Sequence, residues 1–244
     1  MQVADAVFVP VKEKRRVIVL IRIMIALACL ALLGALGFRM LGWVGTKQPE
    51  ELVLVNPWNS VDSTGYSANL TDIGNGMKAD KVCAAALKEM MEDCAAAGNQ
   101  PYICSAYRSR ETQKTLFENK VQRLVDEGVD PEEAPAVAAR TVAMPGTSEH
   151  ELGLAFDIVD FNYQVLDEAQ EDTPTAQWLY ENAWRYGFIL RYPEGSQDTT
   201  GIVYEPWHYR YVGRAAAEQI SQMGITLEEY VSMFYSEQAV ITYD

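Results

Sequence analysis

The longest hydrophobic segment of the chain lies near its N-terminus. Arg22 is the only charged residue between Val17 and Phe38, and about 20 apolar residues are enough for a helix to cross a bilayer. The basic cluster KEKRR precedes this segment, and positive flanking charge favours the cytoplasmic side of a membrane. The pattern predicts a cytoplasmic tail, a single-pass transmembrane anchor and an extracellular remainder, over residues 1–16, 17–44 and 45–244.

Two other interpretations of this segment stay open. Small residues near Gly34 to Gly37 could form the cut site of a cleaved signal peptide, and Cys29 could belong to a lipoprotein signal. An uncleaved anchor is favoured because the apolar run is long and no A-x-A site follows it. The residues before Cys29 also match a lipoprotein signal poorly.

The pattern changes twice after the predicted anchor. Residues 45–76 are rich in Gly, Pro, Asn, Ser and Thr, which predicts a linker and an extended arm, with a possible short strand at Leu52–Val55. A helical periodicity then begins at Lys78 and continues to Ala97, where Gly98 provides a stop signal. One apolar stripe of this helix is predicted at Val82, Ala86, Met90 and Cys94.

Helical and extended patterns are interleaved irregularly over the rest of the chain. Strands are predicted at Pro101–Ala106, Leu154–Phe161 and Tyr204–Val212, the last interrupted by Pro206. Helices are predicted from Ser109 to Glu127, at Glu132–Ala139, from Thr173 through Tyr186 to a stop at Gly187, and after a capping box of Thr226 and Glu229. This order predicts an α+β fold over residues 77–244, a small domain with a largely antiparallel sheet flanked by helices.

Composition and charge narrow the class of protein. The 244 residues are 49% hydrophobic, enough for a substantial core, and the formal net charge is −14. Residues 1–44 hold six basic and two acidic residues, a net +4, so the remainder carries −18. An extracellular body this acidic is repelled by phosphate backbones, which argues against nucleic acid as a partner.

Three cysteines fall in the predicted extracellular part, where disulfides persist. Cys94 and Cys104 could come within bridging distance, but with Cys83 the number is odd, so at least one thiol is free or pairs elsewhere. The alternative is that all three are buried small apolar residues. Their spacing offers no CxxC pair, which argues against a cysteine zinc site.

The chain contains two histidines, and each stands in a polar and aromatic setting. Asp157 alternates with the large apolar residues of its predicted strand, so it can share a cavity with His150 just before that strand and with His208. Two imidazole nitrogens and a carboxylate oxygen, with a fourth position for water, suit a catalytic zinc ion. Glu205 would be a free carboxylate for proton transfer. The spacing leaves open that both histidines are ordinary hydrogen-bonded residues.

Several motifs carry a family resemblance. The stretch SEHELGLAFDIVD has the pattern S-x-H-x-x-G-x-A-x-D, EPWHYRYVG has the pattern E-x-W-H, and SAYRSRETQ is close to S-G-Y-R-S-x-x-x-Q, with Ala106 in place of the usual glycine. In this order the motifs resemble the VanY-type D-alanyl-D-alanine carboxypeptidases, zinc peptidases that act on peptidoglycan. The similarity extends from about Leu52 to about Tyr230.

The resemblance implies a role for each matching residue. Zinc would be held by His150, Asp157 and His208, with Glu205 as catalytic base and acid. Arg108 would bind the substrate and stabilise the developing oxyanion, and the substrate groove would be lined by Gln113, Ser148, Tyr192 and Trp207. The implied activity is removal of the C-terminal D-alanine from peptidoglycan stem peptides by a membrane-anchored enzyme outside the cell.

Three alternatives remain at this stage. An L,D-carboxypeptidase acting on tetrapeptide stems would share the metal machinery. A non-catalytic module that binds wall peptides would keep the fold, although it would have no need of Glu205. A structural anchor protein would leave the paired motifs unexplained. No obligate protein partner is evident from the sequence.

Overall fold

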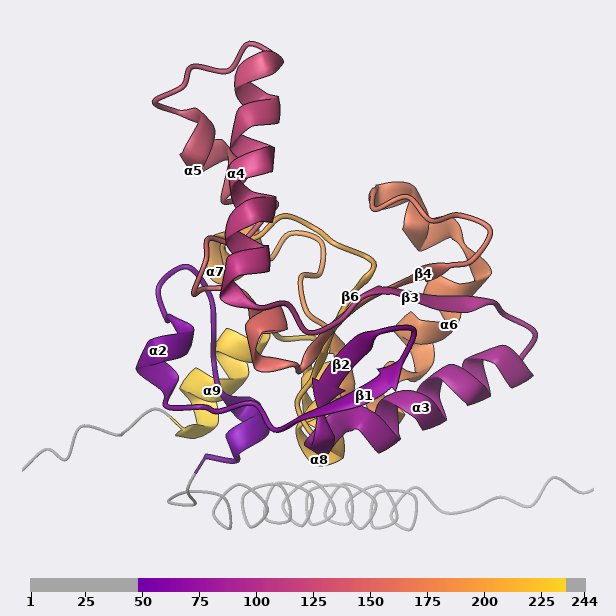
Figure 1. Cartoon of the computed structure of the whole chain (residues 1–244). Helices are drawn as coiled ribbons and strands as arrows, with labels where there is room; N and C mark the ends of the chain where they lie inside the picture. The colour runs from indigo at the N-terminus through magenta and orange to yellow at the C-terminus, as the bar shows by residue number, and fades with distance from the viewer. Residues whose placement is uncertain (1–47, 236–244) are drawn as a thin grey trace, which may run out of the picture. The chain divides into compact units, whose positions relative to one another are not determined.

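The computed structural model describes residues 48–235, and a four-stranded antiparallel sheet forms their centre (Figure 1). The strands lie in the order β3-β4-β6-β5, which span Pro101–Ser105, Ala155–Asp160, His208–Tyr211 and Phe188–Leu190. The predicted α+β class with a largely antiparallel sheet is confirmed. Strands β3 and β4 match their predicted segments closely, β6 is shorter than predicted, and β5 has no counterpart among the predicted strands.

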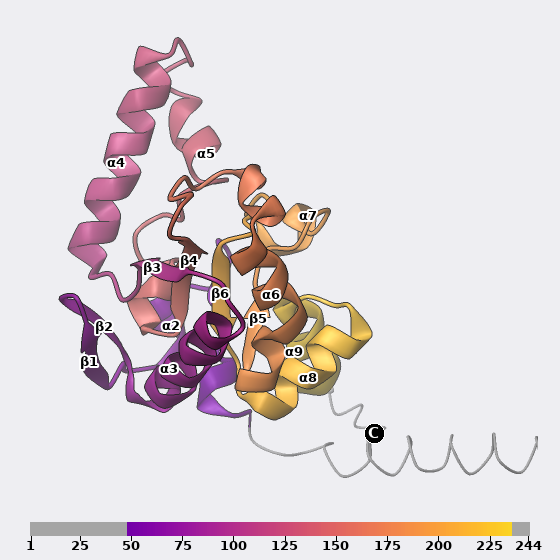
Figure 2. The same ribbon diagram turned by 90° about the vertical axis from the view of Figure 1, so that its right-hand side faces the viewer.

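Helices α3 (Lys81–Ala96) and α6 (Pro174–Asn182) lie side by side on one face of this sheet (Figure 2). The main core forms between these helices and three large apolar residues: Leu154, which directly precedes β4, and Phe156 and Ile158 within it. The other side chains of β4, including Asp157, therefore face away from this core. The strand alternation predicted from the sequence is confirmed.

The predicted apolar stripe of α3 is wrong in part. The buried positions are Cys83, Leu87, Met90 and Cys94, which follow the i, i+4, i+7, i+11 spacing of one helical face. Val82 is 47% exposed, because it lies one position off that face. Residues 77–80 also belong to a strand, so the helix begins at Lys81 rather than Lys78.

Residues 48–76 are packed as part of the same unit as the rest of the domain. Leu52 and Val55 are buried in it, and the predicted strand at 52–55 is absent: Leu52 instead ends a 3-10 turn that begins at Glu50. The end of the predicted arm pairs with the next segment as a hairpin of β1 (Leu70–Gly74) and β2 (Met77–Asp80). Alternating polar residues hide this hairpin in the sequence.

Helix α4 (Arg110–Asp126) begins as predicted, with the Ser109 hydroxyl accepting a hydrogen bond from the Thr112 backbone N–H. It forms a helical hairpin with the short α5 (Ala134–Ala138), and this hairpin stands away from the sheet (Figures 1 and 2). A small second core holds it together, built from Leu124, Ala134 and Ala138 with four partly buried apolar side chains.

The remaining helices complete the domain. A 3-10 turn, Ala183–Tyr186, continues α6 to Gly187, in agreement with the predicted stop. The last helix, α9 (Leu227–Tyr235), carries the predicted capping box, since Thr226 and Glu229 bond reciprocally. Three α-helices of the described residues are not predicted from the sequence: the short α2 (Val61–Thr64) and α7 (Gln197–Thr200), and α8 (Arg214–Met223).

No helix within residues 48–235 combines the length and the apolar character needed to cross a bilayer. The predicted tail (1–16) and anchor (17–44) lie outside the described residues.

Candidate metal centre

Backbone register brings two of the candidate ligands together. Asp157 on β4 and His208 on β6 are directly opposite each other in the antiparallel ladder. Such neighbours have Cβ atoms about 5 Å apart on the same face of a sheet. The Asp157 Oδ1 and His208 Nδ1 atoms lie 3.0 Å apart, and both residues are buried.

His150 approaches from a short 3-10 helix, Glu149–Leu152, rather than from an open loop. Its Nδ1 lies 2.7 Å from the Ala106 carbonyl oxygen, which can only accept, so Nδ1 carries the proton and Nε2 has a free lone pair. Nε2 lies 3.3 Å from Asp157 Oδ2. Gly153, with a φ of +70°, caps the C-terminus of this 3-10 helix. The strand that carries Asp157 begins two residues later.

These three residues form a compact set of potential ligands. One ligand atom from each of His150, Asp157 and His208 lies within 4.8 Å of the others. The Nε2 atom of His150 has no hydrogen-bond partner in the described part of the chain. A buried nitrogen without a partner is costly, and two imidazoles with a carboxylate are a common ligand set for a catalytic zinc ion.

The two histidines differ in their electrostatics. Burial lowers the pKa of His150 to about 4, helped by the Arg108 guanidinium, so this imidazole is neutral at pH 7. Burial opposes charge on His208 as well, but its contacts with the Asp157 and Glu149 carboxylates outweigh that effect and raise its pKa to about 9. The surrounding carboxylates therefore favour positive charge at this position.

Glu205 supplies a separate carboxylate. Its Oε2 lies 3.7 Å from His208 Nδ1, and the backbone N–H of His208 donates to the Glu205 carbonyl, so the turn through Pro206 holds the two side chains on the same side. Burial, together with the charge of Asp157, raises the pKa of Glu205 to about 8. The position fits a group that both takes up and releases a proton.

Arg108 lies just beyond the end of β3 and is held at three points. Its Nη2 donates to Asp157 Oδ2 at 3.0 Å, its Nη1 to Gln113 Oε1 at 2.9 Å, and its Nε to Ser105 Oγ at 3.0 Å. The Gln113 amide group in turn donates to the Ala143 carbonyl. Gln113 thus holds the guanidinium in position, whereas the sequence predicts only that Gln113 lines the groove.

All of the predicted site residues line one groove of about 650 Å³. Tyr192 is buried with its ring 4.8 Å from the His208 ring, centroid to centroid. Ser148 is buried beside His150, while Trp207 is partly exposed in the groove wall. The structure therefore brings together every residue that the sequence singles out. Their individual roles remain predictions.

A buried charge network behind His208 has no counterpart in the sequence prediction. Glu149 Oε1 accepts from Arg191 Nε at 2.8 Å and from Arg210 Nη1 at 2.7 Å. Arg191 is also paired with Glu228. Burial alone would raise the pKa of Glu149, but the two guanidiniums outweigh it and hold the pKa well below its usual range. The feature of the sequence that could have pointed to Glu149 is its position directly before His150.

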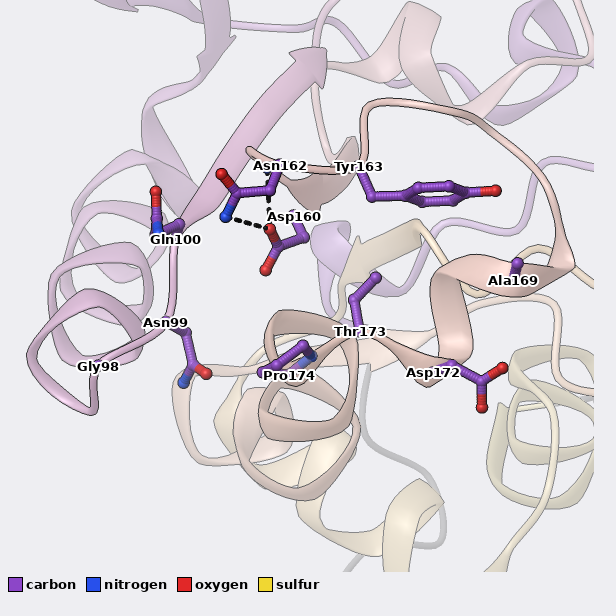
Figure 3. Close-up of a pocket in the computed structure, with 10 residues that line it drawn as sticks. All are labelled: Gly98, Asn99, Gln100, Asp160, Asn162, Tyr163, Ala169, Asp172, Thr173 and Pro174. Atoms are coloured by element: carbon purple, nitrogen blue, oxygen red, sulfur yellow. Dashed lines mark hydrogen bonds between the residues drawn. The ribbon is translucent and has the colours of Figure 1, made fainter.

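A second cavity, of about 470 Å³, lies at the other end of β4 around Asp160 (Figure 3). Asp160 Oδ1 accepts from the backbone and side-chain nitrogens of Asn162, and Oδ2 accepts from the Thr175 hydroxyl. Both carboxylate oxygens are therefore already used by the protein. This cavity offers no free ligand atom comparable with His150 Nε2.

The three cysteines within residues 48–235 form no disulfide. Cys83, Cys94 and Cys104 are free thiols, the first two buried and the third partly buried. Burial raises the pKa of each to about 12. The structure therefore agrees with the second alternative from the sequence, in which the three cysteines are small apolar residues rather than partners in a disulfide.

Comparison with known proteins places this centre in a family. Residues 76–214 match the sequence profile of the VanY family of D-alanyl-D-alanine carboxypeptidases. A D-alanyl-D-alanine carboxypeptidase of Enterococcus faecalis is 39% identical over 189 residues, which cover 77% of this chain and 68% of that protein.

Solved structures of related carboxypeptidases are similar to this chain as well. VanYB in complex with D-alanine-D-alanine has a TM-score of 0.69 and 38% identity, covering 75% of this chain and 98% of that one. A VanY D,D-pentapeptidase variant with Zn(II) has a TM-score of 0.68 and 38% identity, covering 75% and 99%. The LD-carboxypeptidase LdcB has a TM-score of 0.58 and 37% identity, covering 69% and 75%. The profile match spans more than half of the chain and includes every predicted metal ligand, so the chain belongs to the VanY family of D-alanyl-D-alanine carboxypeptidases.

Proposed function

We propose that this protein is a zinc-dependent D-alanyl-D-alanine carboxypeptidase that removes the C-terminal D-alanine from peptidoglycan stem peptides. One observation carries the proposal: three buried metal-binding side chains and a separate buried carboxylate, Glu205, meet in a single groove. A module that only binds wall peptides needs no proton carrier beside its metal. The separate carboxylate therefore favours a hydrolase.

The protein groups fit a zinc ion held by His150, Asp157 and His208. The Nδ1 proton of His150 is committed to the Ala106 carbonyl, which leaves Nε2 as the ligand atom. For His208, Nδ1 faces Asp157 while Nε2 faces Glu149, so Nδ1 is the ligand atom. When bound, zinc polarises the scissile carbonyl and lowers the pKa of a water molecule. A Zn(II) complex of a related VanY protein supports this assignment.

Glu205 moves the proton in the proposed hydrolysis. Its carboxylate removes a proton from the attacking water as the new C–O bond forms, and returns it to the amine nitrogen of the departing D-alanine as the C–N bond breaks. The burial of Glu205 keeps bulk water from competing for this proton. The second water proton leaves the new carboxyl group as that group ionises and ends on the same amine, so the products are a carboxylate and the ammonium form of D-alanine.

Arg108 positions the substrate in this proposal. A guanidinium has five N–H groups, and three of those of Arg108 bond to Asp157, Gln113 and Ser105. The remaining two lie on a side chain that is 18% exposed in the groove. They suit the terminal carboxylate or the developing oxyanion of the substrate.

An L,D-carboxypeptidase is the second candidate, and the similarity to LdcB favours it. The D,D activity is preferred because the Enterococcus faecalis relative carries that name and VanYB binds D-alanine-D-alanine. The two activities share the metal and the proton carrier. They differ in the configuration of the residue before the cleaved bond.

The proposal also includes a location. The stem peptides lie outside the cytoplasmic membrane, and the basic cluster before the apolar segment at 17–44 favours an N-terminus in the cytoplasm. We propose that this segment anchors the enzyme with its catalytic domain outside the cell. A reporter fused to the C-terminus of the full chain should be accessible to protease on intact cells, and protection would contradict this topology.

The activity is tested by incubating the full chain with pentapeptides that end in D-alanyl-D-alanine and with tetrapeptides that end in an L,D bond. We expect release of D-alanine from the pentapeptide, loss of release after exhaustive chelation, and recovery with added zinc. Turnover that survives complete metal removal would exclude the zinc mechanism. Release from the tetrapeptide alone would assign the L,D activity instead.

A further inference from the structure

One face of α4 forms a wall of the groove. Gln113, Leu116, Lys120 and Arg123 all line it, and their spacing of i, i+3, i+7 and i+10 places them along a single face of the helix. Gln113 at the start of this face bonds to Arg108, which bonds to Asp157. The face therefore leads away from the metal centre along the helical hairpin seen in Figure 1.

The two cations on this face differ from others on the same helix. Arg110 is paired with Asp62 and Glu151, and Lys114 with Glu118. Among residues 48–235, by contrast, no carboxylate lies within ion-pair distance of Lys120 or Arg123. Unpaired cations in the groove of so acidic a chain point to an anionic partner from outside the protein.

The acidic groups of the groove do not offset these cations. Asp157 and Glu205 are the carboxylates that line it, and both belong to the metal centre. The part of the groove beside Lys120 and Arg123 is thus cationic. Lys120 is partly buried and Arg123 is exposed, so both can reach a bound ligand without first breaking an internal contact.

Helix geometry sets the distance from the reacting bond. At about 1.5 Å per residue, Lys120 lies about 10 Å and Arg123 about 15 Å along α4 from Gln113. An extended peptide advances about 3.3 Å per residue. A peptide that starts beside Gln113 would therefore have its third residue before the cleaved bond beside Lys120, and its fourth to fifth residue beside Arg123.

We propose that Lys120 and Arg123 form a subsite for a carboxylate on the N-terminal side of the substrate, at the third or fourth residue before the cleaved bond. This inference rests on the proposed function and deepens it. In a stem peptide the free α-carboxylate of the γ-linked glutamate occupies the third position before that bond. The subsite therefore selects stems with a free carboxylate over stems in which it is amidated.

The test compares three peptides that all end in D-alanyl-D-alanine. The first carries the γ-linked glutamate, the second its amide, and the third is the short N-acetyl-lysyl-D-alanyl-D-alanine, which lacks this residue. The variants are the double substitution Lys120→Met with Arg123→Met, and Lys114→Met as a control on the same helix. Lys114 is paired with Glu118 and does not line the groove.

We expect the unmodified chain to favour the acidic over the amidated peptide by about three- to tenfold in kcat/KM at low salt, mainly through KM, since exposed charge pairs contribute modestly. The double variant should treat the two alike and should cleave the short peptide as well as the unmodified chain does. Lys114→Met should keep the preference. Added salt should weaken the preference in the unmodified chain.

Two results would overturn the subsite: equal cleavage of the acidic and amidated peptides by the unmodified chain, or an equal loss on all three peptides in the double variant. Failure of the unmodified chain to release D-alanine from any of the three peptides would instead count against the proposed activity. Calorimetric titration of the Glu205→Gln chain with the acidic and amidated peptides tests the subsite without turnover. Equal affinities there would also reject it.

Discussion

Glu149 Oε2 lies 3.7 Å from His208 Nε2, and neither atom has a hydrogen-bond partner elsewhere in residues 48–235. The other oxygen of Glu149 is fixed by Arg191 and Arg210. The carboxylate is therefore rigid, and it favours the orientation of the His208 ring in which Nδ1 points towards Asp157. Groups that orient a metal-binding histidine in this way contribute substantially to affinity.

We expect Glu149→Gln to weaken zinc binding about 10- to 100-fold, because the amide cannot hold the His208 imidazole as a charged carboxylate does. Competition with a chromogenic chelator measures this affinity directly. The matched control is Glu228→Gln. This substitution also removes a carboxylate that pairs with Arg191, but Glu228 does not contact His208. Equal zinc affinity in Glu149→Gln and the unmodified chain would remove Glu149 from this role.

The proton-transfer role of Glu205 predicts a variant with metal but without turnover. Glu205→Gln should bind zinc with near-normal affinity and lose about 10²- to 10⁴-fold in kcat, the usual contribution of general acid–base catalysis. Metal content is measured by elemental analysis and turnover by release of D-alanine. Glu194→Gln, an exposed position outside the groove, serves as control, and normal kcat in Glu205→Gln would contradict the mechanism.

The sequence predicts the metal centre better than the rest of the fold, for a physical reason. The segment alternates as a strand does, and successive side chains of a strand point to opposite faces, so Asp157 faces away from Leu154, Phe156 and Ile158. The direct pairing of Asp157 with His208 depends on the register between β4 and β6. That register is a long-range property, and the motif resemblance rather than the local pattern anticipates it.

The hairpin β1–β2 and the Glu149 network show where local pattern fails. Alternating polar residues of the hairpin resemble a loop, because its strands are short and partly exposed. In the sequence Glu149 resembles any surface glutamate, because the arginines that pair with it, Arg191 and Arg210, lie 42 and 61 residues away along the chain. The burial of a charged side chain can be predicted only when the residues that pair with it in the folded structure are known.

The cysteines give a prediction that depends on pH. Because burial raises the pKa of Cys83, Cys94 and Cys104 to about 12, only about one thiol in ten thousand is ionised at pH 8, and the thiolate is the reactive form. All three should resist iodoacetamide in the native protein at pH 8. They should react at the rate of a free cysteine after unfolding in guanidinium chloride.

Peptide mapping by mass spectrometry follows each thiol separately. Cys104 is only partly buried, so as the pH rises towards 10 it should be the first to react, while the buried pair stays protected. Rapid native labelling of any of the three at pH 8 would contradict the burial and the raised pKa. Recovery of a cysteine peptide linked to another would contradict the free thiols.

Gly153 joins the His150 turn to the strand of Asp157, in a place where no other residue fits. Its φ is +70°, and a Cβ atom there would lie 2.9 Å from the Asp80 backbone nitrogen and 3.0 Å from a Leu70 methyl group. The neighbouring backbone is fixed as well, since the Asp80 N–H donates to the Gly153 carbonyl at 2.9 Å. A side chain would thus impose both a strained φ and a collision with backbone.

We expect Gly153→Ala to lower the free energy of unfolding by about 2–4 kcal/mol, from the positive φ and the backbone displacement together. Gly195→Ala is the matched control, because Gly195 has a φ of +77° but no atom within 4 Å of the added Cβ, which leaves a cost of only about 1 kcal/mol. Guanidinium denaturation followed by circular dichroism gives both values. Since the displaced segment carries His150, Gly153→Ala should also weaken zinc binding, whereas Gly195→Ala should not. Equal losses of stability in the two variants would show that the backbone at Asp80 shifts at little cost. The contact between Gly153 and the β1–β2 hairpin would then not be what holds the His150 turn in place.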